Sequence, residues 1–182
     1  MDGIASSAPL IARPSFDRAC SFVLSEYVRA WEWFLREEQR GDLWDKLPYR
    51  TNVDGPHYPF RLTIDSEPFP VSRDSGIFWP GRGRVKHPRE KTFALSVHNS
   101  KRGAYPDVPP LYLEDGTWVL KYSSQSASVE NWRDQDYNQK MTNCMECGVP
   151  VGVFFATSAG YKVLGLAFVE RYEPENSWFV LH

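Results

Sequence analysis

The chain has 182 residues, of which 42% are hydrophobic, 15% aromatic and 24% charged. This composition predicts one globular domain over residues 1–182, with residues 1–12 as a flexible leader, and it is not the composition of a disordered chain. The formal net charge is −2, so any affinity for nucleic acid must come from local basic patches.

No apolar run approaches the roughly eighteen residues of a transmembrane helix, and the N-terminus lacks the pattern of a signal peptide. The three cysteines (Cys20, Cys144 and Cys147) contain a single C-x-x-C, without the second pair that a zinc site needs. We therefore expect no metal, no cofactor and no membrane contact, and a reducing intracellular compartment.

The first predicted element is an amphipathic helix from Pro14 to Gly41, because apolar residues recur there at spacings of three and four. A short helix or turn is expected in DLWDKLPYR, residues 42–50.

Later segments are rich in β-branched and aromatic residues and predict strands. They are PFRLTID (59–65), KTFALSVHN (91–99), TWVLKYS (117–123), PVGVFFATS (150–158), YKVLGLAFVERYE (161–173) and SWFVLH (177–182). Turn signals separate them at Asp54-Gly55, Asp115-Gly116, Ala159-Gly160 and residues 173–176.

The last three of these segments predict a meander, and GVFF and VLGLAFV are apolar on both faces, which is typical of buried strands. One further helix is expected near residues 131–147. The predicted fold class is α+β, with N-terminal helices packed on a curved, mostly antiparallel β-sheet.

The first stretch that could carry a binding function is PGRGRVKHPREK, residues 80–91. Its glycines and prolines predict a loop whose backbone can approach a ligand. Its basic side chains could contact phosphates or enter a groove. These candidates are Arg82, Arg84, Lys86, His87 and Arg89. The alternative is an ordinary solvated charge run.

The second stretch is NSKRGAYPDVPP, residues 99–110. Lys101 and Arg102 suit a phosphate, whereas Tyr105 and Pro106 form a stiff apolar surface that a phosphate would not seek. The alternative is a proline-rich loop that seals a sheet edge.

Two further candidates are single residues. Arg133 lies near a helix start, where a cation is unfavourable unless it faces an anion. His57, beside Tyr58 in a turn, could contact a backbone or a base. A surface ion pair and an unremarkable turn histidine are the alternatives.

No catalytic motif is present: the sequence lacks G-x-S-x-G, H-E-x-x-H, a P-loop and a calcium-loop pattern. The four histidines show no metal-ligand spacing. We therefore expect a binding module with no catalytic residues.

The segments TFALSVHNSKRGAYPDV, WVLKYSS, GVPVGVFF and YKVLGLAFVERYEPENSWFVL, with a helix around Asp134 to Asn138, carry a family resemblance. They resemble the region upstream of HNH nuclease domains in bacterial modification-dependent (type IV) restriction enzymes. Such regions include sulfur-binding domains, which read DNA phosphorothioate, and related SRA-like readers of modified bases. The resemblance covers residues 92–182 well and residues 14–91 loosely, and it implies an SRA- or PUA-like half-barrel.

In sulfur-binding domains a Tyr-Pro pair and a small apolar residue three positions later form the cavity for the sulfur atom. The resemblance places this cavity at Tyr105, Pro106 and Pro109, where Pro109 stands in place of the family's alanine. It places the basic and histidine contacts on His57, the loop of residues 82–91, Arg102 and Arg133.

The resemblance implies a DNA-binding domain for phosphorothioate-modified duplex, located in the bacterial cytoplasm with the nucleoid. Its nuclease would be a domain or subunit outside this chain. The alternative is a base-flipping reader of 5-methylcytosine or another modified base, which needs an aromatic-walled pocket. An enzyme or a PUA-like RNA-binding module are more distant alternatives.

Overall fold

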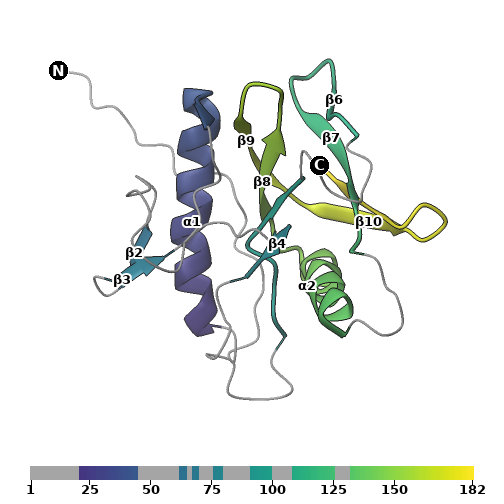
Figure 1. Ribbon diagram of the computed structural model, residues 1–182. Helices are drawn as coiled ribbons and strands as arrows, with labels where there is room; N and C mark the ends of the chain where they lie inside the picture. The colour runs from purple at the N-terminus through teal and green to yellow at the C-terminus, as the bar shows by residue number, and fades with distance from the viewer. Residues whose placement is uncertain are drawn as a thin grey trace.

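The structure, a computed structural model, describes residues 21–44, 62–64, 67–69, 76–79, 91–99, 108–125 and 132–182 (Figure 1). Within these residues the chain forms two α-helices and three β-sheets, of five, four and two strands. The predicted α+β class is confirmed. None of the described helices is long and apolar enough to cross a membrane.

Helix α1 (Ser21–Arg40) is the described part of the helix predicted from Pro14 to Gly41. It ends where the sequence predicts. Gly41 has a left-handed φ of 66°, and its N–H donates to the Glu37 carbonyl oxygen at 3.1 Å. Glycine adopts this conformation without a Cβ clash, so it closes the last turn of the helix.

The five-stranded sheet is mixed rather than wholly antiparallel. In sheet order its strands are β1 (Leu43–Trp44), β9 (Tyr161–Ala167), β8 (Val151–Ala156), β5 (Ser96–His98) and β4 (Ile77–Phe78). β5 and β8 run parallel, with Val97 opposite Val153, and the other neighbours are antiparallel. The prediction of a mostly antiparallel sheet is confirmed, with this one parallel pair added.

The four-stranded sheet has the order β10 (Val169–Glu173), β11 (Trp178–Leu181), β7 (Trp118–Ser123) and β6 (Leu111–Tyr112). A separate hairpin pairs β2 (Leu62–Ile64) with β3 (Glu67–Phe69). In Figure 1 the helices α1 and α2 lie on opposite sides of β8, with the β10–β11 hairpin extending beyond α2.

Two strand assignments from the sequence were wrong. Leu43 and Trp44, expected in a helix or turn, form β1 opposite Lys162 and Tyr161, because pairing with β9 prevails over local preference. The segment 161–173, predicted as one strand, forms the two strands β9 and β10, which belong to different sheets. The predicted meander is therefore interrupted between β9 and β10. Phe168 marks the break: it exchanges two backbone hydrogen bonds with His182, at 2.8 and 3.0 Å.

The β6–β7 connection confirms the turn predicted at Asp115-Gly116. The Gly116 N–H donates to the Leu113 carbonyl, and the Asp115 carboxylate accepts from the backbone N–H and the hydroxyl of Thr117 at 2.9 and 2.6 Å. These two bonds, the hydroxyl bond first, hold the pKa of Asp115 below its usual value. The predicted turn at 54–55 lies outside the described residues.

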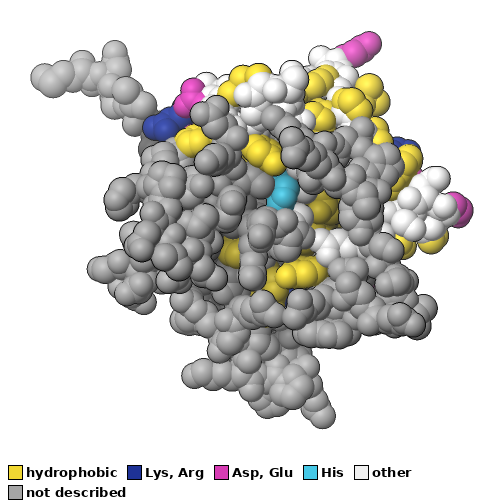
Figure 2. All heavy atoms as spheres, in the orientation of Figure 1, with side chains coloured by type: hydrophobic (Ala, Val, Ile, Leu, Met, Phe, Trp, Pro, Cys, Tyr) yellow, Lys and Arg dark blue, Asp and Glu magenta, His cyan; other side chains and the backbone are white. Residues whose placement is uncertain are grey.

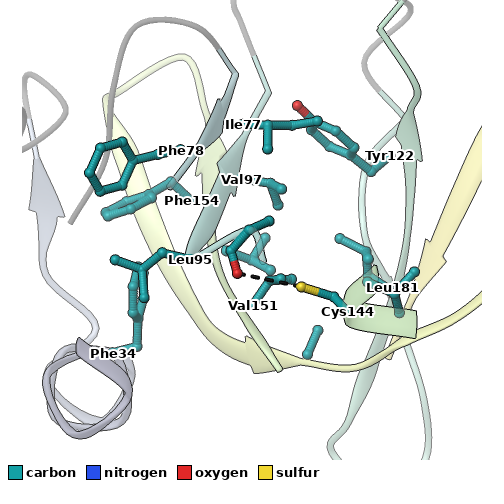
Figure 3. Packing of buried hydrophobic residues seen from close by; sticks show 14 of the residues in the cluster. Phe34, Ile77, Phe78, Leu95, Val97, Tyr122, Cys144, Val151, Phe154 and Leu181 are labelled. Carbon is teal, nitrogen blue, oxygen red and sulfur yellow. Dashed lines mark hydrogen bonds between the residues drawn. The ribbon is translucent and has the colours of Figure 1, made fainter. Parts of the chain in front are cut away.

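The core lies between the two larger sheets and under α1. The predicted burial of β8 and β9 is confirmed: Val151, Val153, Phe154 and Val163 are at most 1% exposed. Figure 3 shows Phe34 of α1 near Phe154 of β8, and its dashed line marks the hydrogen bond from the Cys144 thiol of α2 to the Ala94 carbonyl. The rings of Phe34 and Phe154 meet edge to face at 5.1 Å.

Helix α1 approaches the sheet closely at Gly152 of β8. A Cβ atom added at Gly152 would overlap the ring of Phe34, so only glycine lets the helix approach this closely. Phe34 is 0% exposed and has no room to move away.

We therefore expect Gly152→Ala to lower the free energy of unfolding by about 1–3 kcal/mol through overpacking. Urea unfolding followed by circular dichroism measures it. Combining it with Phe34→Leu, which removes the overlapped ring, should cost less than the sum of the two single changes. If the losses in free energy of unfolding of the two single variants simply add in the double variant, the overlap between residue 152 and the Phe34 ring is not the cause of the destabilisation.

Candidate nucleic-acid interface

Most of the predicted site residues fall outside the described part of the chain. Pro109 is described and exposed, and Arg133 lies in the first turn of α2 (Trp132–Cys147), where its side chain is not described. The helix predicted near 131–147 is thus confirmed. The predicted site residues outside the described ranges are His57, Arg82, Arg84, Lys86, His87, Arg89, Lys101, Arg102, Tyr105 and Pro106.

The structure describes the helices and strands that flank those segments, which are here called the framework. Side chains of helix α2 bind several of its residues. The Asn138 side chain binds both backbone groups of Gln125: Oδ1 accepts the N–H at 2.9 Å, and Nδ2 donates to the carbonyl at 2.8 Å. Gln125 is the last described residue before segment 126–131, which leads into α2 and Arg133. The helix thereby fixes the chain just ahead of its own start.

Further along α2, two side chains bind the chain that enters β5. Asn143 Nδ2 donates to the Thr92 carbonyl at 2.7 Å, and the Cys144 thiol donates to the Ala94 carbonyl at 3.5 Å. Gly148, with φ 62°, ends the helix as predicted, and the Val149 N–H closes it on the Cys144 carbonyl.

Cys144 and Cys147 form no metal site with other described residues. No group of three or more His, Cys, Asp and Glu side chains within the described ranges could hold a metal ion. Cys144 is 1% exposed, and burial raises the pKa of its thiol far above the ordinary value, so it stays protonated and serves as a hydrogen-bond donor in the core.

Lys140 is the most unusual residue of this framework, because it is a lysine only 1% exposed. Its ammonium group pairs with the Asp136 carboxylate at 2.5 Å and lies 4.3 Å from the ring centre of Trp79 and 5.7 Å from that of Tyr137. An aromatic face and a carboxylate compensate for the removal of its hydration shell. Lys140 is therefore a structural cation and is not available to an external phosphate.

The two ends of the basic segment 80–90 both lie against α2. Trp79 precedes the segment and is held by Lys140, while Lys91 follows it and pairs with Glu146 at 3.1 Å. The hydrogen bond with Glu146 raises the pKa of Lys91. Sequence reasoning found the basic segment but not this attachment, which only tertiary contacts reveal.

A second meeting point lies at the carboxyl end of β5. The His98 N–H donates to the Gly76 carbonyl at 2.8 Å, and a Cβ at Gly76 would lie 3.0 Å from Tyr122 Oη and 3.2 Å from Gln125 Nε2. Asn99 follows β5, and its Oδ1 accepts the Ala156 N–H at 2.6 Å.

Gly76, Asn99 and Gln125 therefore lie near one another at the carboxyl end of β5. Two of them border segments that lead to candidate binding residues: Asn99 precedes residues 100–107, and Gln125 precedes residues 126–131. The Asn99 side-chain nitrogen is buried and has no hydrogen-bond partner among the described residues. Sequence reasoning did not select Asn99 as a site residue, although a polar residue directly after a buried strand was the available signal.

Several cations of the described framework are already neutralised. Lys121 and Arg171 both bind Glu173, at 3.3 and 2.8 Å, and Arg40 binds Glu37 at 2.9 Å. The hydrogen bond from Arg171, followed by that from Lys121, lowers the pKa of Glu173. Figure 2 shows hydrophobic side chains and histidine among the coloured residues of the face drawn.

Comparisons with known proteins found similarity to solved structures. No family model matches the sequence, and no curated protein matches it. Among solved structures, the chain is similar to the SUVH5 SRA domain in complex with methylated CHH DNA, with 24% identity, a TM-score of 0.41 and coverage of 60% of this chain and 72% of that one. A complex of the same domain with hemi-methylated CG DNA gives 26% identity, a TM-score of 0.40 and the same coverage. Superpositions at this TM-score are loose and do not define a common family.

The paired hydrogen bonds of Asn138 yield a testable expectation. Asn138→Ala removes the two hydrogen bonds that hold the partly buried backbone of Gln125, which should destabilise the protein by about 1–3 kcal/mol. Hydrogen exchange of the Gln125 amide should accelerate accordingly.

The matched control is Gln139→Ala, which removes a hydrogen bond between side chains on α2 itself, Gln139 to Asn143. It should leave exchange at Gln125 unchanged. Equal acceleration in both variants would mean that α2 as a whole has loosened, and that Asn138 has no special role.

Proposed function

We propose that this chain is a non-catalytic reader of modified double-stranded DNA and that the mark it reads is a backbone phosphorothioate. Tyr105, Pro106 and Pro109 form the apolar contact for sulfur. Lys101 and Arg102 hold the neighbouring phosphates, and Arg133 and His57 complete the contact. The segment 82–91 follows the backbone and reaches base edges.

The observation that supports this proposal best is the convergence of the framework. Asn99 and Gln125 border the segments leading to Tyr105 and to Arg133. Gly76 lies between them: its carbonyl accepts the N–H of His98, which precedes Asn99, and a Cβ at Gly76 would lie 3.2 Å from Gln125 Nε2. Two segments that are separate in the sequence thus start from neighbouring, half-buried residues. A binding site built from two loops requires such a shared base.

The chemistry of the mark fits the mixed character of segment 99–110. Sulfur in place of a non-bridging oxygen is larger, more polarisable and a weaker hydrogen-bond acceptor. Burying it against a ring and pyrrolidine carbons contributes about 1–2 kcal/mol. An ordinary phosphate oxygen in that place would give up its water partners, which costs about 1–3 kcal/mol. Discrimination then comes from the apolar contact and affinity from the cations.

The charge distribution supports the loop cations as the phosphate contacts. Lys121, Lys140 and Arg171 are bound to carboxylates of the framework. Segment 80–90 carries four cations (Arg82, Arg84, Lys86 and Arg89) against one acid, Glu90. These loop cations supply the sequence-independent, salt-dependent part of binding.

A base-flipping reader of 5-methylcytosine or a similar base is the second candidate. One observation favours it: within the described part of the chain the side-chain nitrogen of Asn99 has no hydrogen-bond partner, and base edges offer acceptors for such a donor. Duplex DNA with a methylated base therefore belongs in the same test.

Binding of three duplexes of one sequence, unmodified, with a single phosphorothioate of defined stereochemistry, or with 5-methylcytosine, decides between the candidates. We expect the phosphorothioate duplex to bind about 100- to 1,000-fold more tightly than the unmodified one. Tyr105→Ala should abolish most of this ratio.

Tyr172→Ala, at an exposed tyrosine of β10, is the matched control and should keep the ratio. Equal affinity for all three duplexes would rule out both candidates. A preference for the methylated duplex alone would rule out the phosphorothioate as the mark and retain the alternative.

The basic segment gives a separate expectation. Replacing Arg82 and Arg84 by glutamine should weaken binding to modified and unmodified duplex equally. It should also reduce the slope of log affinity against log salt by about 0.9 for each phosphate that is no longer neutralised. Arg171→Gln, which alters an internally paired arginine, should leave the slope unchanged. An unchanged slope in the double variant would exclude this segment from binding phosphate.

A further inference from the structure

Lys140 of α2 is a buried cation whose presence stability alone does not explain. Only 1% of the residue is exposed, and the removal of an ammonium group from water is costly. Its carboxylate partner, Asp136, is 47% exposed and therefore stays within reach of water. An apolar side chain of similar length would fill the same space without this cost, and such replacements of buried ions are often neutral or stabilising. The lysine therefore supplies something other than stability.

The contacts of Lys140 indicate what it supplies. Its ammonium group pairs with the Asp136 carboxylate and donates to the Asp136 backbone carbonyl at 3.2 Å. Both contacts lie within one turn of α2 and fix the ammonium group relative to the helix. The same group lies 4.3 Å from the ring centre of Trp79. Because a cation prefers the face of an indole ring, an ammonium group fixed on α2 determines how Trp79 is oriented.

Trp79 lies where the backbone pairing of β4 has ended. Phe78 opposite Ser96 is the last pair of β4 with β5, and the Phe78 carbonyl accepts the Leu95 N–H at 2.7 Å. Trp79 follows Phe78 directly, and the basic segment 80–90 follows Trp79. The contact with Lys140 therefore attaches the chain to α2 one residue beyond the strand, immediately before the segment.

The other end of segment 80–90 has a more exposed attachment. Lys91 pairs with Glu146 at 3.1 Å, and their side chains are 45% and 50% exposed. An ion pair between half-exposed side chains is screened by water and fixes position poorly. A cation–aromatic contact that is removed from water is stronger. The start of the segment is therefore held more firmly than its end.

We propose that Lys140 is a positioning residue for DNA binding: it contacts no phosphate, and it holds Trp79 so that segment 80–90 leaves α2 in the direction that brings its cations to the duplex. The inference rests on the proposed function, since it assigns the phosphates to this segment. A wrongly directed segment keeps its charges but reaches fewer phosphates at once. Lys140 therefore affects affinity for modified and unmodified duplex alike and has no part in the choice of the mark.

Lys140→Met tests the proposal, because methionine retains an apolar stem and lacks the ammonium group. We expect this variant to unfold at no lower urea concentration than the unchanged chain. It should nevertheless bind modified and unmodified duplex about tenfold more weakly, with an unchanged ratio between them. Lys140→Arg keeps a cation that stacks on an indole ring and should restore most of the affinity.

Lys121→Met is the matched control. Lys121 lies 4.7 Å from the ring centre of Trp178 and pairs with Glu173 at 3.3 Å, but it belongs to β7 of the four-stranded sheet. Its replacement removes the same two kinds of contact at a different place in the fold. Duplex affinity should therefore stay unchanged.

A fluorine label provides a readout that does not depend on DNA. In a chain labelled with 5-fluorotryptophan, the Trp79 resonance is assigned with Trp79→Phe. It should shift or broaden in Lys140→Met and return toward its original position in Lys140→Arg. Trp79→Leu removes the ring instead of the cation, so it should weaken duplex binding by the same factor as Lys140→Met, and the double variant should lose no more. Trp79→Leu also keeps the test valid if Lys140→Met does not fold.

An unchanged Trp79 resonance in Lys140→Met overturns the proposal, and so does a changed resonance with unchanged duplex affinity. An equal loss of affinity in Lys121→Met overturns it as well, because the effect would then not depend on the segment. If the unchanged chain binds no duplex, the proposed function fails and the DNA role of Lys140 fails with it. If it binds duplex and Lys140→Met binds equally well, only the positioning role fails.

Discussion

The rest of the candidate interface depends on the hydrogen bonds between α2 side chains and distant backbone groups. Asn138 binds Gln125, and Asn143 binds Thr92, so one helix fixes the chain both before β5 and after β7. The helix also buries Met141 and Cys144 in the core, and its polar bonds add to this apolar packing. Such bonds fix position more narrowly than apolar contact does, because each requires a particular geometry. A polar helix is therefore a suitable base for loops that must meet at one place.

The sequence predicted those parts of the fold that local patterns control. Gly41 and Gly148 end the helices because each supplies a left-handed residue, and the continuous apolar runs of β8 and β9 identify buried strands. Local patterns could not reveal β1, since two residues become a strand only by pairing with β9. They also concealed the break at Phe168, because apolar residues continue through it from one sheet into the next.

The sequence predicted which segments could form the candidate site, because basic residues, prolines and glycines mark them. It did not predict the contacts that hold the ends of those segments in place. Lys140, by contrast, looks like a surface cation in the sequence, and its burial depends on Trp79, which is distant along the chain, as well as on its neighbour Asp136. Asn138 is likewise an ordinary polar helix residue until Gln125 is placed next to it. Residues that position the candidate site, such as Lys140 and Asn138, are identified from tertiary contacts. Residues that would contact the ligand are identified from the chemistry of their side chains.

The place of β11 in the four-stranded sheet has a consequence for synthesis of the protein. β11 follows every other described strand in sequence, yet it lies between β10 and β7, and its Phe179, Val180 and Leu181 are at most 2% exposed. A nascent chain can therefore form α1 and the β8–β9 hairpin on the ribosome, but β7 lacks its inner neighbour until β11 emerges. Until then the apolar face around Tyr122 and Leu120 is open to chaperones or to aggregation. This half of the core is therefore completed only after β11 has left the ribosome.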